Sequence, residues 1–596
     1  MKAKNVLTLL VKLVIVFSLL GVFPVSAAPI QGEASLPSVA VAQANKSPSP
    51  KFSNAVAFDI SPAARDLKPS GKPATAPDEV IDIRPDRGPL ATDQGFSGDG
   101  ALQGASALRA LTAELSTLAM PETMANFEGL SNEDNRSLFG FRVAPPDPVG
   151  DVGPNHYVEM INLAFAVYDK QGNMLLGPAP IGALWEGFAV EDCTDPAGDP
   201  IVLYDQLEDR WLLSQFTTRG PDYYDCVAIS QTGDPTGAYY RYAFVTQPDP
   251  DPRGGTFFPD YPKYGVWTDS YIMTTRDFGW VDYGISVYAL EKNKMIAGNP
   301  KARAVQFFLD SADVPLYLIG DGLLPPDIDG TRRPIDRVAA PIVGTMDDNA
   351  FYGAPFDALN IWELWVQWKA KPEAWLSLAT QLPVAGFDSI FPCFPTSRDC
   401  IPQPGVTERT RFLDILSYRQ RPTHRLAYRN FGTYEALVTT QSVEARPGMA
   451  GMRWYEIRRL GNPKPLTYEV YQQGTYAPDD GVHRWMGSVA MDWQGNMALG
   501  YSVSNATDVY PGIRYAGRLA GDPLGEMGLG EGVIINGTGS QLTTSSRWGD
   551  YTSMNIDPVD DCTFWYVNQY YAITELAAWQ TRIASFKLPG CEPKVD

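Results

Sequence analysis

The feature that most constrains the fold of this chain is a weak repeat of strand-length segments. From about residue 149 onward, short apolar or alternating runs recur between Gly, Asp, Asn and Pro, and long helical periodicity is nearly absent. Seven segments share one order: a polar start, an apolar strand, a turn and an aromatic strand. Their starts lie roughly 50–90 residues apart, which is close to the length of a four-stranded blade with loop insertions. The starts are Gly150, Gly198, Pro259, Arg332, His424, His483 and Ser546.

The repeat predicts an all-β fold, a β-propeller that occupies residues 127–596. A four-stranded sheet with two apolar faces is buried only when neighbouring sheets stack on both sides, and a closed ring of blades achieves this. We expect seven blades, with six as the alternative. Two β-sandwiches in tandem are the rival architecture, because irregular repeats also suit short strands joined by turns.

The N-terminal part of the sequence has a different character. Lys2 and Lys4 precede an apolar run, and Val25-Ser26-Ala27-Ala28 supplies small residues, so residues 1–28 are predicted to be a signal peptide. Residues 29–99 are rich in Pro, Ala and Ser and are predicted to be a flexible leader. Residues 100–126 are expected to hold one short helix, over 101–119, and a linker. No later stretch approaches the roughly 20 apolar residues that a membrane span needs.

The six cysteines are an even number, and in an exported protein they predict disulfides. Proximity in the sequence favours Cys193–Cys226, Cys393–Cys400 and Cys562–Cys591. A zinc cluster is the alternative, but the chain has no Cys-x-x-Cys pair and only three histidines. The exported location and the disulfides together predict a secreted or extracellular protein.

The charge balance excludes some partners. Lys and Arg total 48, Asp and Glu total 69, and the formal net charge is −21. Such a chain lacks the basic surface that phosphate backbones require, so nucleic acid and acidic lipid are not expected partners. We expect an extracellular glycan or a surface protein instead.

Four stretches carry a resemblance to a known group of proteins: PPDPVGDVGPNHYVEMINLAFAVYDKQGN, GDPIVLYDQLEDRWLLSQF, HRWMGSVAMD and SRWGDYTSMNIDPVDDCTFWYVNQYY. Through them, residues 127–591 resemble a family of exported bacterial proteins of poorly defined activity, within the broad group of sialidase-like propellers. The resemblance implies a fold and a compartment. The repeated Asp-box and the Arg-Ile-Pro motif of sialidases are both missing, which weakens any transfer of sialidase activity.

Candidate catalytic residues come from the blade starts, which a propeller gathers around its axis. Three arginines from successive blades would form a cluster of fork-shaped donors suited to a carboxylate, beside acids that serve as general acid or base. A tyrosine and a glutamate add a possible nucleophile and base. The alternative is that each arginine pairs with an acid of a neighbouring blade and only ties sheets together. These candidates are Arg425, Arg484, Arg547, Asp550, Tyr434 and Glu435.

Other blade-start residues are candidates for ligand or metal binding. Asp199, Asp260, His424 and His483 are the candidate ligand-binding residues. Calcium, which prefers six to eight oxygen ligands, is a possible structural ion, although no EF-hand loop is present. Its candidate ligands are Asp151, Asp557 and Asp560, together with Asp147, Asp561, Asp347 and Asp348. For any single one of these acids, capping of a turn is the favoured interpretation.

One aromatic segment offers a further binding surface. Trp362, Trp365 and Trp368 in IWELWVQW suit a sugar-binding face if they are exposed, but their spacing on a strand also favours burial between blades.

Three functions follow from these candidates. The main hypothesis is a secreted propeller that binds an extracellular ligand, most simply a glycan or a cell-surface partner, at its central funnel or loop face. The alternative is a sialidase-like glycoside hydrolase that uses the arginine cluster and carboxylates. A calcium-stabilised scaffold without a small ligand is the third.

Overall fold

The computed structural model describes most of the chain from residue 48 onward. Segments outside it include the predicted signal peptide and most of the predicted helix over 101–119. The described residues are 48–67, 79–83, 95–104, 119–246, 256–279, 283–334, 338–349, 352–391, 393, 399–415, 420–461 and 466–593.

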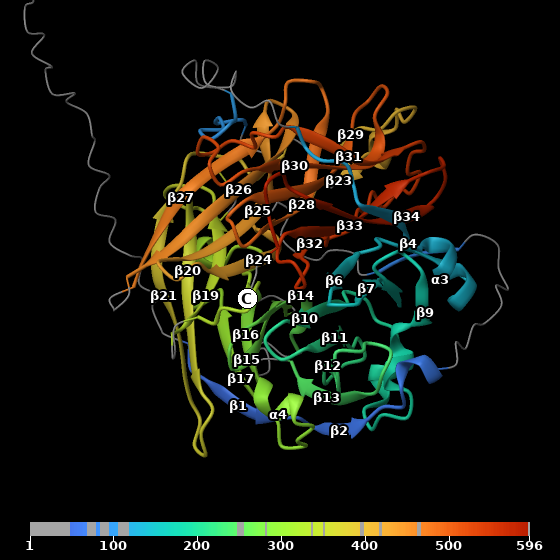
Figure 1. Cartoon of the computed structure of the whole chain (residues 1–596), viewed down its shortest axis with the longest axis vertical. Helices are drawn as coiled ribbons and strands as arrows, with labels where there is room; N and C mark the ends of the chain where they lie inside the picture. Colours follow the sequence, from blue (N-terminus) through green and yellow to red (C-terminus); the bar gives the residue numbers. More distant parts are fainter. Residues whose placement is uncertain are drawn as a thin grey trace, which may run out of the picture. The chain divides into compact units, whose positions relative to one another are not determined.

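The described part of the chain is an all-β, seven-bladed propeller, which confirms the predicted fold and excludes tandem sandwiches. Figure 1 shows the first strand of each sheet near the middle and the last strands at the periphery. Within each blade, consecutive strands pair antiparallel.

Blade 1 is β6 (Val149–Val152), β7 (His156–Ile161), β8 (Ala164–Asp169) and β9 (Met174–Pro180). Blade 2 is β10 (Ile201–Asp205), β11 (Arg210–Phe216), β12 (Tyr224–Ser230) and β13 (Tyr239–Val245). Blade 3 is β14 (Phe258–Val266), β15 (Ser270–Phe278), β16 (Tyr283–Glu291) and β17 (Arg303–Asp310).

The remaining blades follow in sequence order. Blade 4 is β19 (Ala340–Met346), β20 (Ala358–Gln367) and β21 (Glu373–Pro383). Blade 5 is β24 (Thr423–Asn430), β25 (Glu435–Arg446), β26 (Met449–Leu460) and β27 (Thr467–Tyr476). Blade 6 is β28 (His483–Met491), β29 (Met497–Ser504), β30 (Tyr510–Arg518) and β31 (Glu531–Gly537). Blade 7 is β32 (Ser553–Ile556), β33 (Thr563–Tyr571) and β34 (Trp579–Lys587).

Blade 4 is the irregular member of the ring. Its inner segment begins with Leu324, whose backbone bridges to Val343 of β19. The segment then continues as β18 (Pro326–Ile328) and pairs in parallel with β24 of blade 5. The predicted start at Arg332 therefore falls just after the inner segment. The starts at Gly150, Pro259, His424 and His483 lie within an inner strand, Gly198 lies just before β10, and Ser546 precedes β32.

The core lies between blades, as stacking of two-faced sheets requires. Aromatic pairs connect neighbouring sheets: the rings of Tyr515 and Phe586 lie 4.3 Å apart between blades 6 and 7. The rings of Tyr157 and Trp565 lie 5.4 Å apart between blades 1 and 7. Blade 7 therefore packs against blade 1, and the ring is closed.

Strand β4 (Ala125–Ser131) completes blade 7 and provides this closure. It pairs antiparallel with β34, with Phe127 opposite Ile583, although the two strands lie at opposite ends of the chain. A capping box at Ser131 then starts α3 (Asn132–Phe139), and β5 (Arg142–Ala144) leads into blade 1. Ala125 and Asn126, which fall in the linker predicted over 100–126, belong to this strand, so the closing strand begins slightly before the predicted propeller start at residue 127.

The prediction of a flexible leader over 29–99 is wrong for residues 48–67. Strand β1 (Lys51–Asn54) pairs with β17, and β2 (Ala57–Ile60) pairs with β13. Phe58 packs against Tyr242, with ring centroids 5.0 Å apart. The outer strands of blades 2 and 3 would otherwise present unpaired backbone groups, and these two short segments satisfy them. A third short strand, β3 (Val80–Asp82), pairs in parallel with β5.

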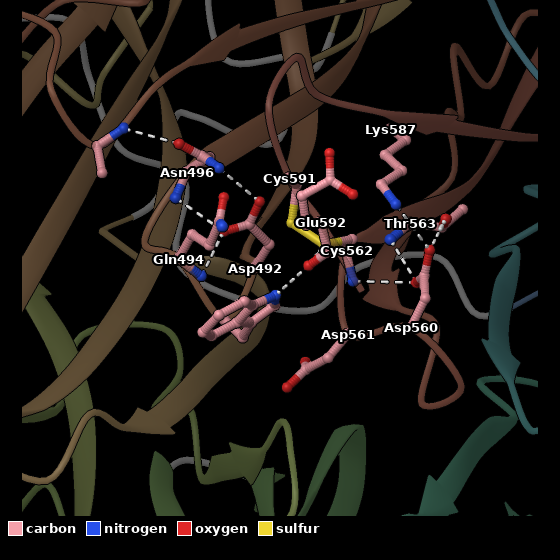
Figure 2. Close-up of a disulfide and its surroundings, with 12 residues drawn as sticks. Asp492, Gln494, Asn496, Asp560, Asp561, Cys562, Thr563, Lys587, Cys591 and Glu592 are labelled. Atoms are coloured by element: carbon pink, nitrogen blue, oxygen red, sulfur yellow. Dashed lines mark hydrogen bonds and ion pairs between the residues drawn. A yellow bond between two sulfur atoms is a disulfide. The ribbon is translucent and has the colours of Figure 1, made fainter. Parts of the chain in front are cut away.

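Three disulfides join the cysteines as predicted: Cys193–Cys226, Cys393–Cys400 and Cys562–Cys591. Figure 2 shows Cys562, in the turn between β32 and β33, bonded to Cys591 after the last strand. Beside this disulfide, the Trp493 indole N–H of blade 6 donates a hydrogen bond of 2.9 Å to the Glu592 carbonyl. The end of the described chain is thus fixed to both blades 6 and 7.

Replacing Leu130 of β4 by Ala tests the closure. The Leu130 side chain is fully buried, so we expect the Leu130→Ala change to lower the free energy of unfolding by about 2–5 kcal/mol. The matched control is Leu524→Ala at a side chain that is 48% exposed, which should change stability by no more than about 0.5 kcal/mol. Denaturant unfolding measures both. Equal effects of the two changes would contradict the assigned role of β4.

The disulfides should differ in their effect on stability. Cys562–Cys591 closes a sequence separation of 29 residues, whereas Cys393–Cys400 closes one of 7. Loop-closure entropy then predicts that the double change Cys562→Ala/Cys591→Ala costs about 3–4 kcal/mol and Cys393→Ala/Cys400→Ala about 2 kcal/mol. Thermal or denaturant unfolding of the two double variants gives the order, and the reverse order would contradict this account.

Candidate functional site

Acidic and basic side chains gather at the ends where the chain enters the inner strands. Asp147 precedes β6, Asp199 precedes β10, Asp260 lies near the start of β14 and Asp550 precedes β32. Because all inner strands enter the ring at the same end, these carboxyl groups meet around the axis. We call this group the axial cluster. Its members are Asp147, Asp199, Asp260, Tyr261, Lys263, Arg421, His424, Arg547, Asp550 and Tyr551.

Two of the acids share a strained backbone. Asp147 and Asp199 are each followed by proline and have φ angles of 46° and 45°. This left-handed conformation is uncommon for residues other than glycine and costs about 1–3 kcal/mol at each position. Asn162 connects the two: its amide N–H donates to Asp147 Oδ2 at 2.7 Å, and its Oδ1 accepts from the Asp199 backbone N–H at 2.8 Å.

The acids lie close enough to influence each other. The Asp550 backbone N–H donates to Asp147 Oδ1 at 2.6 Å. Burial and then the Asp550 carboxylate raise the pKa of Asp147 to about 7. Burial and the charges of Asp147, Asp260 and Asp550 raise the pKa of Asp199 well above its ordinary range. The cluster therefore favours at least one carboxyl group in its protonated form.

The hydrogen bonds of Tyr551 identify Asp199 as that group. The Tyr551 hydroxyl lies 2.9 Å from Asp199 Oδ2 and 3.1 Å from the Pro262 carbonyl oxygen. A phenol has one proton, so it can donate only one linear hydrogen bond. Both contacts are satisfied when a protonated Asp199 donates to Tyr551 and Tyr551 donates to Pro262.

Lys263 is buried in the middle of the cluster. Its Nζ lies 3.1 Å from the centroid of the Tyr261 ring and 3.2 Å from that of Tyr551. Among the described residues, Nζ has no hydrogen-bond partner. Burial and the nearby charge of Arg421 hold the pKa of Lys263 well below its usual range. A buried amine without a hydrogen bond is costly unless cation–π contacts offset it or a ligand completes it.

His424 is a second buried group of this kind. Its ring lies 6.3 Å from the Tyr551 ring, and within the described ranges neither ring nitrogen has a hydrogen-bond partner. Burial, with Lys263 and Arg425 nearby, holds the pKa of His424 well below its ordinary value. The imidazole is therefore neutral and can either donate to or accept from a ligand.

Two arginines complete the cluster. The Arg421 guanidinium carbon lies 4.1 Å from the Tyr261 ring centroid. Arg547 lies 3.7 Å from Asp550 and donates to the Ile83 carbonyl at 3.3 Å. Most members of the cluster are less than 9% exposed, whereas Asp260 is only partly buried. Asp260 is thus the carboxyl group most open to solvent.

Further along the axis, a second set of charges is fully paired. Arg425 of β24 donates to Asp327 and Asp329 at 2.8 Å each, and to the Met554 carbonyl at 3.0 Å. Arg429 donates to Asp561 at 2.9 Å. These bonds connect blades 4, 5 and 7. Arg425 therefore takes the structural role that we had considered as the alternative.

The predicted convergence of Arg425, Arg484 and Arg547 is not found. Arg484 binds Asp480 at 2.7 Å and Glu531 at 2.8 Å, both associated with blade 6. Of these three arginines, only Arg547 belongs to the axial cluster. The three arginines lie at similar blade starts, but each one pairs with different carboxylates. Strand register alone does not determine which carboxylates lie within reach.

Tyr434 and Glu435 lie at the opposite end of blade 5 from His424, since the whole of β24 separates them. Glu435 accepts from Tyr428 and Arg459, and Tyr434 stacks on Phe431 with ring centroids 4.9 Å apart. His483 also lies outside the axial cluster, where its Nδ1 accepts from the Ala450 backbone N–H at 3.3 Å. The structure thus brings together Asp199, Asp260, His424, Arg547 and Asp550 of the predicted residues.

The predicted calcium ligands Asp151, Asp557 and Asp560 point to different partners. Asp151 accepts from the Tyr204 backbone N–H at 2.6 Å. Asp557 pairs with Lys170 at 2.8 Å. Asp560 caps its own turn through the Thr563 N–H at 2.9 Å, as Figure 2 shows. Turn capping describes the Asp560 contact, whereas Asp151 and Asp557 bind groups of neighbouring blades.

Another set of acids does approach: ligand oxygens of Asp347, Asp348 and Asp357 lie within 4.8 Å of one another. Asp347 and Asp357 already accept backbone N–H bonds from Ser389 and Phe387, at 2.7 and 3.0 Å. Calcium binding stays a prediction.

Sequence reasoning missed Tyr261, Lys263, Arg421 and Tyr551 as site residues, and considered Asp147 only for calcium. One signal was present. Asp147-Pro148, Asp199-Pro200 and Tyr261-Pro262 place an X-Pro pair at three successive blade starts. That repeat marks the positions where the backbone turns into the inner strand.

No protein-family model matches the chain, and no curated protein matches it. Solved structures similar to it include a mutant of an α-L-arabinanase from Cellvibrio cellulosa, at 14% identity, 53% of this chain, 90% of that chain and a TM-score of 0.24. An endo-arabinase from Bacteroides thetaiotaomicron has 12% identity, 53% and 92% coverage and a TM-score of 0.23. An α-L-arabinofuranosidase from Podospora anserina has 11% identity, 57% and 94% coverage and a TM-score of 0.22. These TM-scores are too low to carry an argument.

Two buried lysines of blade 3 provide a test of the site. Lys292 is fully buried and pairs with Asp205 at 2.6 Å, whereas Lys263 has no hydrogen bond among the described residues. We expect Lys292→Met to lower the free energy of unfolding by about 3–5 kcal/mol, because it leaves the Asp205 carboxylate unpaired. Lys263→Met should change stability by no more than about 1 kcal/mol. Denaturant unfolding compares the two, and a large loss in Lys263→Met would mean that Lys263 has a structural role.

Proposed function

We propose that this protein hydrolyses a glycosidic bond at the axial cluster, with Asp199 as proton donor and Asp260 as the second carboxylate. The observation that carries the proposal is the hydrogen bonding of Asp199, which is satisfied when its carboxyl group is protonated. Glycoside hydrolysis needs one carboxylic acid to protonate the leaving oxygen and one carboxylate to act as base or nucleophile.

The two carboxyl groups differ in the way that this chemistry requires. Asp199 is buried, and burial together with three neighbouring acids favours its protonated form. Asp260 comes from the adjacent blade and is partly exposed, so water or a sugar can reach it. Asp260 is also one of the charges that raise the pKa of Asp199. A pair of acids held in different environments is the usual means of assigning opposite roles.

The two buried groups without hydrogen bonds would serve to bind the substrate. The Lys263 amino group and the neutral His424 imidazole are two buried hydrogen-bonding groups within the same cluster. Sugar hydroxyls match such groups. Arg421 and Arg547 balance the negative charge that four neighbouring acids would otherwise accumulate.

Glycan binding without turnover is the second candidate. It rests on the burial of most of the cluster, since Asp147, Lys263 and His424 are each 1% exposed. In this function the cluster fixes the inner strands, and loops around Asp260 contact the ligand.

We also propose an extracellular location. Three disulfides support it, because such bonds persist in oxidising compartments. Among the described residues, no helix has the length and apolarity to cross a membrane.

Conservative amide substitutions test the reaction. Asp199→Asn and Asp260→Asn should each lower kcat/KM about 10²–10⁴-fold, measured as release of reducing ends from a panel of soluble polysaccharides. The matched control is Glu159→Gln, which changes a buried carboxyl group of blade 1 whose pKa burial raises to about 7. Glu159 lies outside the cluster, so activity should persist. Binding of a polysaccharide by the unaltered chain without turnover would favour the second candidate, and full activity in Asp199→Asn would exclude the proposed acid.

The pH dependence gives an independent check. Asp199 donates a proton only while it is protonated, and its pKa is raised. The rate should therefore be retained through neutral pH and fall as the pH rises through that pKa. Measuring kcat/KM across the pH range gives the alkaline limb, and a rate that increases steadily with pH above neutrality would contradict this role.

A further inference from the structure

The axial cluster is buried around Asp199, although the proposed reaction needs a sugar to reach that carboxyl group. Asp199 and Arg547 are each 6% exposed, and Lys263 is 1% exposed. A polysaccharide is too large to enter a closed interior. Some part of the chain that covers Asp199 must therefore move before a glycosidic bond can reach it.

Ile83, which follows strand β3, lies directly on this side of the cluster. A methyl group added at Gly198, the residue before Asp199, would lie 2.9 Å from Ile83 Cγ2. The same position is 3.3 Å from Asn162 Oδ1, so Ile83 packs beside the amide that connects the two strained aspartates. The Ile83 carbonyl oxygen also accepts the hydrogen bond of 3.3 Å from Arg547. Ile83 therefore covers the cluster next to Asp199.

The segment that carries Ile83 is weakly attached. β3 forms a sheet of only two strands with β5, and the pairing is parallel. The Ile83 N–H donates to the Ala144 carbonyl at 2.8 Å, and the Arg142 N–H donates to the Glu79 carbonyl at 2.9 Å. None of residues 79–83 is buried, and Ile81 is 37% exposed. Segments with few buried contacts open at a low free energy, so this one can detach locally.

A second small sheet near the cluster is held more firmly. β22 (Asp399–Ile401) and β23 (Leu413–Asp414) form two strands, and the Ser546 hydroxyl donates to the first residue of β22. However, the last residue of β22 and the first residue of β23 are fully buried. The inner strands are in turn held by their blades. Of these parts of the described chain, the segment 79–83 is the one that can leave most readily.

We propose that residues 79–83 form a strap that holds the axial cluster closed, and that a glycan chain reaches Asp199 only when the strap is displaced. This inference rests on the proposed hydrolysis, because it concerns access to the same acid. The strap and the glycan compete for one position. The apparent affinity for the glycan is then reduced by the fraction of molecules in which the strap is open. The strap therefore raises KM and leaves kcat unchanged.

Ile83→Pro in the full chain tests the strap. Proline has no N–H, so the bond to the Ala144 carbonyl is lost, and a smaller ring replaces the side chain that covers Gly198. The readout is the coupling of carboxyl groups to an added amine by a water-soluble carbodiimide, measured at each residue by mass spectrometry. We expect coupling at Asp199 to become at least tenfold faster. For a polysaccharide that is hydrolysed, we expect KM to fall.

Glu159 and Ile60 provide the controls. Glu159 is a buried carboxyl group outside the cluster, so its coupling rate should not change in Ile83→Pro. Ile60→Pro alters β2 at the rim of blade 2, where Ile60 is 54% exposed, and should leave the coupling of Asp199 unchanged. Faster coupling at both Asp199 and Glu159 would indicate a general loosening of the fold and would overturn the proposal.

A reversible lock covers the case in which Ile83→Pro does not fold. Asp82 and Ala144 are paired in register. Neighbouring strands lie about 4.8 Å apart, which is within the Cα separation of disulfides. In Asp82→Cys/Ala144→Cys, oxidation should slow the coupling of Asp199 at least tenfold, and reduction that leaves the three native disulfides intact should restore it. Equal rates in the oxidised and reduced forms would overturn the proposal.

Coupling and hydrolysis together separate this inference from the proposed function. Faster coupling of Asp199 in Ile83→Pro, without hydrolysis by any form of the chain, would support the strap and overturn the proposed reaction. Hydrolysis with the same KM and the same Asp199 coupling rate in the unaltered chain and in Ile83→Pro would overturn the strap and leave the reaction.

Discussion

The structure depends on one constraint: a blade has two apolar faces, so it is stable only between two neighbours. A row of blades would leave both end sheets exposed, and the ring removes those ends. The hydrogen bonds between β4 and β34 carry this closure, because they build the last sheet from both ends of the polypeptide. Everything at the axis follows from it, since the inner strands meet only in a closed ring. The N-terminal strands β1 and β2 extend the same principle to the outside, where they cover the edges of blades 3 and 2.

The axial cluster and the paired charges around Arg425 contain the same residue types but serve different purposes. Around Arg425, each cation meets its anion at hydrogen-bond distance, and the blades are tied together. Around Lys263 and His424, burial is as complete but hydrogen bonds are missing among the described residues. Stability alone favours the first arrangement. The second, with its strained aspartates, is the one that a binding or catalytic function would explain.

Much of the fold could be predicted because the spacing of strands and turns is a local property of the sequence. The starts at Gly150, Pro259, His424 and His483 fall within inner strands, and the three disulfides join neighbours in sequence. The closing strand could not be found in this way: Phe127 is opposite Ile583, and no local pattern encodes so distant a partner. The candidate site was still harder to predict from the sequence. Arg484 and Arg547 have similar sequence settings, yet one binds Asp480 and Glu531 while the other reaches Asp550. The sequence around Lys263 gave no indication that it is a site residue, because its surroundings depend on two tyrosines from different blades.

The pairing of β4 with β34 also governs the order of events during synthesis. Residues near 127 leave the ribosome long before those near 583, so the closing strand has no partner until almost the whole polypeptide exists. Blade 1 must wait with one face uncovered until blade 7 exists, and that face remains available to other chains in the meantime. A product cut short before β34 would contain six of the sheets and still lack a closed structure. Closure of the ring is therefore a late event, because it needs β34.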